Sequence, residues 1–366
     1  MRAAWVMLAA TALFAVGARA AEPEAYRISG PVVHENLAIY FVHGKSADGP
    51  VPLTLQEALA NGSAVVRETG SVNQLEVENT GNDEVFIQSG DIVKGGRQDR
   101  VLTVSLIVPP HSGKMPIASF CVEQGRWTAR GREDAHRFET ASAAVPSREA
   151  KIAMKVPAAS PAASGSVPST APPVGERSHA AYLSSLDVSR RQQEVWKDVA
   201  NIQNKLSQAV AAPVAMPESR SSLQLSLEND KLKEVQGGYV KALQPAGEAG
   251  DDVIGYVFAV NGKLNSADLY PSNGLFRKMW PKLLAATAVE AIGDKPAGAS
   301  TALPSNEDVL AFLKSAEAGK AVEQPLIAGN RLETREAVGA LFFETEHVPS
   351  APSANATWVH RNYIAK

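Results

Sequence analysis

Alternating apolar and polar positions predict short β-strands along the first part of the chain. The stretch "LAIYFVHG" at 37–44 and the longer "RVLTVSLIVPP" at 100–110 are predicted strands, and two prolines end the second. Between them, "NQLEVENTGNDEVFIQSGD" alternates on both sides of the polar "NTGND", which predicts a β-hairpin. Short strands at this spacing favour an antiparallel sandwich or barrel.

From residue 189 the apolar positions recur every three to four residues, which is the period of an α-helix. In "SRRQQEVWKDVANIQNKLSQAV" they form one stripe, made of Val195, Val199, Ile202, Leu206 and Val210. A second helix is predicted in "ENDKLKEVQGGYVKAL". A third is predicted in "NGLFRKMWPKLLAATAVEAIG", where Pro281 is expected to kink or split it.

Strand patterns return in the last part of the chain. The Asn261-Gly262 pair between two apolar runs is the strongest short signal for a β-hairpin. The segments "EAVGALFFETEH" and "TWVHRNYI" are expected to pair antiparallel around a loop that contains proline. Together these elements predict an α+β protein, with an antiparallel β-rich sandwich or barrel-like body and several packed helices.

The first twenty residues have the composition of a secretory signal peptide. Arg2 gives a positive start, an apolar run follows, and the small-residue pattern "ARA" ends at Ala20. We therefore expect residues 1–20 to be removed and the protein to be exported, to the periplasm or the extracellular space. Cleavage there removes two of the 36 basic residues and none of the 39 acidic residues, so the net charge becomes −5.

Composition divides the remaining chain into three segments. Residues 21–156 form the β-rich part, and residues 179–366 form a helical and β part that is expected to pack with it as one domain. Residues 157–178 are rich in proline, alanine and serine, which predicts a disordered insertion. No later stretch is apolar enough for a membrane span, which takes roughly 20 apolar residues.

Several kinds of partner and site are not expected. The negative net charge argues against nucleic acid as the main partner. The seven histidines form no His-x-His or His-Glu-x-x-His motif, so we expect surface or hydrogen-bonded histidines, no metal site and no cofactor. The single cysteine, Cys121, lies in the apolar "ASFCVE" and is expected to be a buried, inert thiol. The sequence predicts no oligomeric state.

Two polar turns are the best candidates for a site. The segment "KGGRQDR" at 94–100 lacks the Gly-Lys-Ser/Thr ending of a phosphate-binding P-loop and precedes a strand. The segment "VEQGRW" at 122–127 ends another strand. If the two strands pair, both turns would lie at the same end of a sheet. The candidate ligand-binding residues are Lys94, Gly95, Gly96, Arg97, Gln98, Asp99, Arg100, Glu123, Arg126 and Trp127. A second such group combines Asp268, Lys278 and Trp280.

These turns favour recognition of an anion. Tandem glycines permit close approach to the backbone, and arginine makes bidentate contacts with phosphate or carboxylate. The leading hypothesis is therefore a binding module for a small anionic molecule. One alternative is a hydrolase that uses Asp99 or Glu123 as general base and the arginines as a clamp. The other is a structural or adaptor protein of the cell envelope, in which 94–100 is a loop-shaping network.

Three long motifs carry a resemblance to a known family. The segments "VFIQSGDIVKGGRQDRVL", "LIVPPHSGKMPIASFCVEQGRW" and "GYVFAVNGKLNSADLYPSNGLFRKMWPKLL" resemble the ADP-ribosylglycohydrolase- and rhodanese/phosphatase-associated protein domain. The resemblance covers most of residues 26–365, apart from the 157–178 insertion. It implies no established activity. The family's name implies a link to ADP-ribose, NAD or phosphate metabolism. The ligand expected from the charged and aromatic residues of the two turns is a phosphorylated sugar or nucleotide.

Overall fold

The structure, a computed structural model, describes residues 26–155, 188–295, 302–348 and 356–366. The predicted signal peptide (1–20) and the predicted insertion (157–178) lie outside the described residues.

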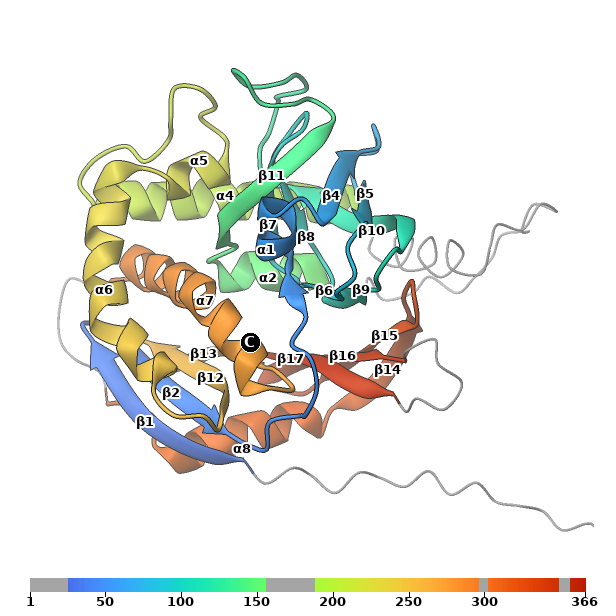
Figure 1. Cartoon of the computed structure of the whole chain (residues 1–366). Coiled ribbons are helices and arrows are strands. Elements are labelled where there is room, and N and C mark those ends of the chain that lie inside the picture. Colours follow the sequence, from blue (N-terminus) through green and yellow to red (C-terminus); the bar gives the residue numbers. More distant parts are fainter. Residues whose placement is uncertain (1–25, 156–187, 296–301, 349–355) are drawn as a thin grey trace, which may run out of the picture.

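Eight antiparallel strands form the larger sheet, and both ends of the described chain contribute to it (Figure 1). Its order is β1-β2-β12-β13-β17-β16-β15-β14. The strands are β1 (Arg27–His34), β2 (Leu37–His43), β12 (Val253–Val260), β13 (Lys263–Leu269), β14 (Lys320–Pro325), β15 (Asn330–Glu336), β16 (Ala340–His347) and β17 (Thr357–Ala365). The N-terminal hairpin β1–β2 therefore belongs to the same sheet as the C-terminal strands.

A closed barrel and a three-stranded sheet make up the rest of the β-structure. The barrel has the order β10-β5-β4-β11-β7-β8, and the small sheet the order β3-β6-β9. The barrel strands are β4 (Ala64–Glu68), β5 (Gln74–Asn79), β7 (Asp91–Gly95), β8 (Arg100–Leu102), β10 (Gly113–Cys121) and β11 (Arg137–Ala144). The small sheet consists of β3 (Leu53–Thr54), β6 (Val85–Ile87) and β9 (Leu106–Val108). The predicted α+β class with an antiparallel, barrel-containing body is confirmed.

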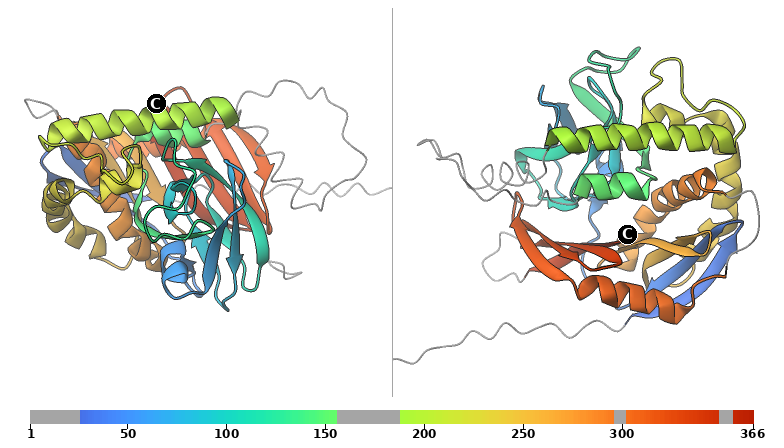
Figure 2. Two further views of the ribbon diagram at one scale, coloured as in Figure 1. Left: turned by 90° about the horizontal axis from the view of Figure 1, so that it is seen from above. Right: turned by 180° about the vertical axis from the view of Figure 1, so that it is seen from behind.

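Helices cover the strands on several sides. They are α1 (Leu55–Ala60), α2 (Arg148–Lys155), α4 (Val188–Ala209), α5 (Leu223–Leu227), α6 (Asp230–Glu248), α7 (Asn273–Gly293) and α8 (Asn306–Glu317). Helix α7 packs on one face of the larger sheet, where it contacts β12, α4 and α6, and α8 covers the opposite face of that sheet (Figure 1). Helix α4 runs beside α2 and along the barrel strand β10 (Figure 2).

Burial on both faces explains the continuous apolar run of β2. Ile39 and Phe41 pack in the core that includes α7, whereas Tyr40 and Val42 pack in the core that includes α8. A strand with both faces covered needs apolar residues at successive positions and not only at alternate ones. The aromatic side chain of Trp280 lies fully buried on α7, with its ring centroid 5.5 Å from that of Phe41.

Two predicted pairings are confirmed by the register. Val260 pairs with Lys263 across the Asn261-Gly262 turn, and both turn residues have the positive φ that a tight hairpin requires, 53° and 73°. Strands β16 and β17 pair antiparallel as expected.

Two other strand predictions are wrong. The "NTGND" segment is no hairpin turn, because β5 pairs with β4 and β10 whereas β6 pairs with β3 and β9. The buried amide of Asn79 donates to the carbonyls of Asp83 and Val108, which holds the chain where it passes between the sheets. The single strand predicted at 100–110 is divided at 103–105 into β8 of the barrel and β9 of the small sheet.

The helix is not split at Pro281, because α7 continues through it from Asn273 to Gly293. A proline removes one helical hydrogen bond and disfavours a helix interior. The burial of Trp280, Leu283 and Leu284 around it offsets that cost.

Candidate functional site

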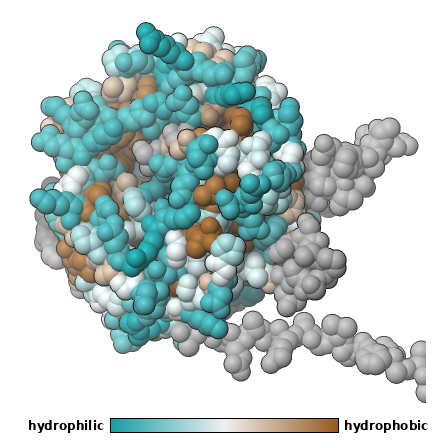
Figure 3. Space-filling model, in the orientation of Figure 1, coloured by the Kyte–Doolittle hydropathy of each residue, from teal (hydrophilic) through white to brown (hydrophobic). Residues whose placement is uncertain are grey.

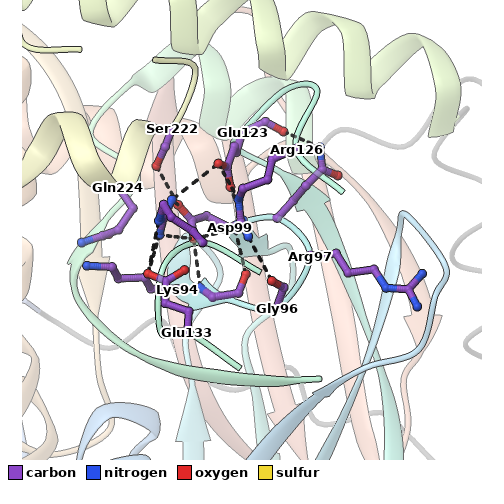
Figure 4. Close-up of polar contacts among 12 residues, drawn as sticks. Lys94, Gly96, Arg97, Asp99, Glu123, Arg126, Glu133, Ser222 and Gln224 are labelled. Carbon is purple, nitrogen blue, oxygen red and sulfur yellow. Dashed lines mark hydrogen bonds and ion pairs between the residues drawn. The ribbon is translucent and has the colours of Figure 1, made fainter. Parts of the chain in front are cut away.

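The structure brings the two polar turns together at one end of the barrel (Figure 4). Strands β8 and β10 pair with Arg100 opposite Cys121, so the segments that precede β8 and follow β10 are neighbours. The backbone N–H of Val122 donates to the carbonyl of Asp99 at 3.0 Å. The expected juxtaposition of the turns is therefore present.

Asp99 is the centre of this cluster, and its carboxylate is fully buried. Its Oδ1 accepts the backbone N–H of Gly95 at 2.9 Å. Arg130 donates to both carboxylate oxygens, at 3.1 and 3.2 Å, and the hydroxyl of Ser222 donates to Oδ2 at 2.6 Å. Donors of the protein itself therefore occupy both oxygens.

Glu123 is equally enclosed. Its Oε1 accepts from Arg126 Nε at 2.7 Å, and its Oε2 accepts from the backbone N–H of Asp99 at 2.9 Å. Burial raises the pKa of Glu123, but the hydrogen bonds from Arg126, Ser219 and that backbone N–H outweigh burial and hold the pKa below its usual value. A general base must reach the proton that it removes. Two buried, ion-paired carboxylates do not favour the role of base expected for Asp99 or Glu123.

Most cations of the cluster are paired with carboxylates of the chain. Lys94 Nζ lies 2.8 Å from Glu228 Oε2, and Arg100, fully buried, lies 3.4 Å from Glu68 Oε2. Gln98 is also buried, and its amide donates to the carbonyl of Glu123. These contacts are the ones expected if the protein is a structural or adaptor protein, in which residues 94–100 form a network that fixes the shape of the loop.

Arg126 is enclosed in the same way. Besides Glu123, its guanidinium donates to the carbonyls of Gly95 and Gly96, each at 3.0 Å.

Arg97 differs from these residues. Its backbone N–H donates to Glu68, but its guanidinium makes no ion pair with any described residue. The guanidinium carbon lies 5.7 Å from the ring centroid of Trp127, whose side chain is 42% exposed. Figure 4 shows the Arg97 side chain pointing away from the buried cluster. Arg97 and Trp127 are therefore the accessible part of the predicted site.

Gly95 and Gly96 allow the turn to pack closely against β11. Gly96 has φ +54°, and a Cβ there would lie 2.3 Å from the ring of Phe138. A Cβ on Gly95, φ +112°, would lie 3.2 Å from the carbonyl of Arg137. The tandem glycines thus allow the turn to pack closely on its neighbouring strand, which is a different reason from the expected approach of a ligand.

Cys121 is buried as predicted, and burial raises the pKa of its thiol to about 11. A thiol with this pKa is a poor nucleophile at neutral pH.

A second polar cluster lies where the barrel, the small sheet and the larger sheet meet. Ser105 precedes β9, Asp268 lies on β13 and His360 lies on β17. Ser105 Oγ is 2.9 Å from His360 Nδ1, and His360 Nε2 is 3.1 Å from Asp268 Oδ1. All three residues are buried. The order serine, histidine, aspartate is that of a nucleophile, its base and the group that orients the base.

The protonation of this cluster follows from its surroundings. Burial lowers the pKa of His360. Burial raises the pKa of Asp268, but the hydrogen bond from His360 and the nearby charges of Lys151 and Lys155 outweigh it and lower the pKa overall. We therefore assign His360 as neutral with its proton on Nε2, facing ionised Asp268. Ser105 Oγ accepts the backbone N–H of Ser89 at 3.0 Å and donates its own proton to Nδ1.

Lys155 ends α2 beside these residues. Its Nζ donates to Asn362 Oδ1 at 2.5 Å, and the Asn362 amide donates to Asp268 at 2.8 Å. Burial lowers the pKa of Lys155 to about 7. Lys155, Ser105 and His360 line a cavity of about 10 Å³, which has room for one water molecule.

Sequence reasoning missed this cluster. In the predicted group of Asp268, Lys278 and Trp280, Lys278 instead pairs with Glu57, and Trp280 Nε1 donates to the carbonyl of Gln244. The available signal was a polar residue inside an apolar strand pattern, "LTVSLIV" for Ser105 and "TWVHRNYI" for His360. Such residues are buried, and buried polar groups need partners.

Within the described ranges, no helix is both long and apolar enough to traverse a bilayer. In the same part of the chain, no three His, Cys, Asp or Glu residues are grouped so that they could hold a metal ion. One face of the molecule is mostly hydrophilic, with small apolar areas (Figure 3).

One comparison with known proteins gives a result. Residues 25–364 match the family model of the ARG and Rhodanese-Phosphatase-superfamily-associated Protein domain. No curated protein and no solved structure matches the chain.

Proposed function

Since the chain belongs to the ARG and Rhodanese-Phosphatase-superfamily-associated Protein domain family, whose name states an association and no reaction, we propose a function from the site itself. The protein is an exported module that binds a small anionic ligand at Arg97 and Trp127. The observation that carries the proposal is the Arg97 guanidinium, which has no carboxylate partner among the described residues and lies over a half-exposed aromatic ring.

The two side chains provide complementary contacts. A guanidinium presents a planar fork of donors that suits a phosphate or carboxylate group. An exposed indole offers a flat face for a sugar or a base. A phosphorylated sugar or a nucleotide, including an ADP-ribose-related molecule, combines both features. The pairing of Lys94, Arg100 and Arg126 with carboxylates leaves the electrostatic contact to Arg97.

A thermal-shift screen of residues 21–366 tests this proposal with ADP-ribose, NAD, ribose 5-phosphate, inorganic phosphate and neutral ribose. A ligand at a hundredfold excess over its dissociation constant raises stability by about 2.7 kcal/mol. We expect a shift with a phosphorylated ligand and none with ribose. Arg97→Ala should weaken binding by about 1.5–3 kcal/mol, because a charged hydrogen bond is lost.

Trp127→Ala should also weaken binding, whereas Arg190→Ala should not, because Arg190 is an exposed arginine on α4 that pairs with Glu194. Absence of a shift with every anion, while the variants fold normally, would reject the binding module and favour the structural or adaptor alternative.

The Ser105–His360–Asp268 cluster supports a second candidate, hydrolysis of an ester or another acyl compound. Ser105 Oγ would attack the acyl carbon while its proton passes to His360 Nδ1. The imidazolium would then protonate the leaving group, and water would release the acyl group from Ser105. The two hydrogen-bond distances favour this candidate. The one-water cavity means that the surrounding side chains must move before a substrate enters.

A fluorophosphonate probe tests this candidate by covalent capture of an activated serine. If the cluster is catalytic, intact-mass and peptide analysis should place one adduct on Ser105, and Ser105→Ala should abolish it. Ser315→Ala, on α8, is the matched control and should label like the wild type. An unlabelled wild-type protein with a native circular dichroism spectrum would contradict the hydrolase candidate.

A further inference from the structure

A pocket of about 240 Å³ lies among α4, α7 and the start of α2, and none of its lining residues belongs to the two clusters described above. Its charged lining is mostly acidic: Glu149, Asp198, Glu290 and Asp294 contribute carboxylates, and Lys205 contributes a cation. Lys205 is occupied, since its Nζ lies 2.7 Å from Asp294 Oδ1. The lining therefore carries an excess of negative charge.

Glu290 gives the clearest sign that the pocket binds a ligand with a hydrogen-bond donor. The residue is only 3% exposed, and its Oε1 accepts the amide of Asn265 at 2.8 Å and the backbone N–H of Arg148 at 3.0 Å. Its Oε2 is buried and has no hydrogen-bond partner in the described part of the chain. Buried polar atoms are normally paired, and an unpaired one costs free energy. A ligand with a donor group would supply the missing partner.

Asp198 is a second acceptor without a partner. It lines the pocket from α4, and none of the described residues forms a hydrogen bond or ion pair with its carboxylate. Burial, and then the negative charge of Glu149, raise the pKa of Asp198. Burial likewise raises the pKa of Glu290, although Lys151 opposes this effect. Both carboxylates therefore lie where added positive charge would be favourable.

The cations around the pocket do not cancel its preference for a positively charged ligand. Arg148 is paired with Glu149 at 3.1 Å. Lys197 adjoins Asp198 in sequence and lowers its pKa, but less than burial and Glu149 raise it.

We propose that this pocket binds a small organic amine in its ammonium form, with Glu290 Oε2 and the Asp198 carboxylate as acceptors. The remaining lining suits such a ligand. Asn201, Asn204 and Gln208 on α4 offer amides for further polar groups, and Ile202 offers an apolar contact for an alkyl chain. The volume exceeds that of a bare ion, and no metal-holding group of His, Cys, Asp or Glu exists among the described residues.

Isothermal titration calorimetry with putrescine, spermidine and ethanolamine tests the proposal, with sodium chloride at matched ionic strength as the blank. We expect saturable one-to-one binding of at least one amine. Glu290→Gln and Asp198→Asn should each weaken it about tenfold or more, because a charged hydrogen bond is lost. Affinity should rise with pH while the carboxylates ionise and the amine stays protonated.

The control is Glu307→Gln, which removes an exposed carboxylate from α8, outside the pocket lining, and should leave binding unchanged. Glu290→Gln keeps an acceptor for Asn265 and Arg148, and its thermal unfolding should be checked beside the wild type. No saturable heat with any amine would overturn the proposal. So would equal binding by all variants, or binding of magnesium or calcium chloride without binding of amines.

Discussion

Replacing Asp99 with alanine should lower the free energy of unfolding by about 3–5 kcal/mol, the cost of breaking a buried ion pair by removing one partner. Asp99 accepts from Gly95, Arg130 and Ser222, and it lies 3.6 Å from Arg126. Without its carboxylate, the nine-tenths-buried Arg130 keeps, among the described residues, only Glu123 and Glu133 as carboxylate partners. A buried charge with too few partners accounts for most of the expected loss.

Urea denaturation followed by circular dichroism measures this loss. Asp99→Asn should fall between the wild type and the alanine variant, because its amide oxygen still accepts from Gly95 or Ser222. The control is Glu194→Ala, whose exposed ion pair with Arg190 contributes about 0–1 kcal/mol. A loss below about 1 kcal/mol for Asp99→Ala would show that a ligand or water can replace the carboxylate. That result would restore Asp99 as a binding residue.

Above neutral pH, the wild type should gain stability relative to Lys155→Met. Burial holds the folded pKa of Lys155 at about 7, well below its ordinary value of 10.5. Below pH 7 the amine is charged in both states, so the folded protein bears the full cost of a buried cation. Between pH 7 and 10.5 the unfolded chain binds more protons, so this cost falls as pH rises. The slope approaches about 1.4 kcal/mol per pH unit.

Urea titrations of the wild type and Lys155→Met between pH 6 and 9 measure the difference in their free energies of unfolding. Taking this difference removes the pH-dependent contributions of the other groups, which both proteins share. Asp268 and Lys151 also act on Lys155, so a shallower slope is consistent with their coupling. Lys114→Met, which removes an exposed cation, should give no pH-dependent difference. A wild-type minus Lys155→Met difference that stays constant with pH would disprove the lowered pKa.

The sequence located the charged turns but could not assign their partners. The expectation that 94–100 and 122–127 would lie together followed from two neighbouring strands, and strand pairing is local enough to anticipate. The carboxylates that pair with the cations come from elsewhere: Glu68 precedes the turns, and Glu228 follows α5. Such distant contacts depend on the whole fold, so an arginine-rich turn looked like an anion site although most of its charge is compensated.

Dependence on distant contacts also explains the errors in the predicted strand pairings. The two-residue Asn261-Gly262 turn fixes its own register, because its positive φ values match the twist of a hairpin. The five-residue "NTGND" segment carries no comparable constraint, and Asn79 uses its side chain to join it to Val108 instead. Ser105 and His360 are 255 residues apart, so no local pattern could have revealed their contact.

The position of the first hairpin in the larger sheet has a consequence for how the chain folds. Strand β2 pairs with β12, and His43 contacts Asp252, 209 residues further along the chain. Contacts over such separations slow folding, because a long loop must close before they form. The barrel strands lie between these partners in sequence and depend on no later strand. The barrel can therefore assemble first, while one edge of β2 stays unpaired until β12 from the C-terminal half of the chain reaches it.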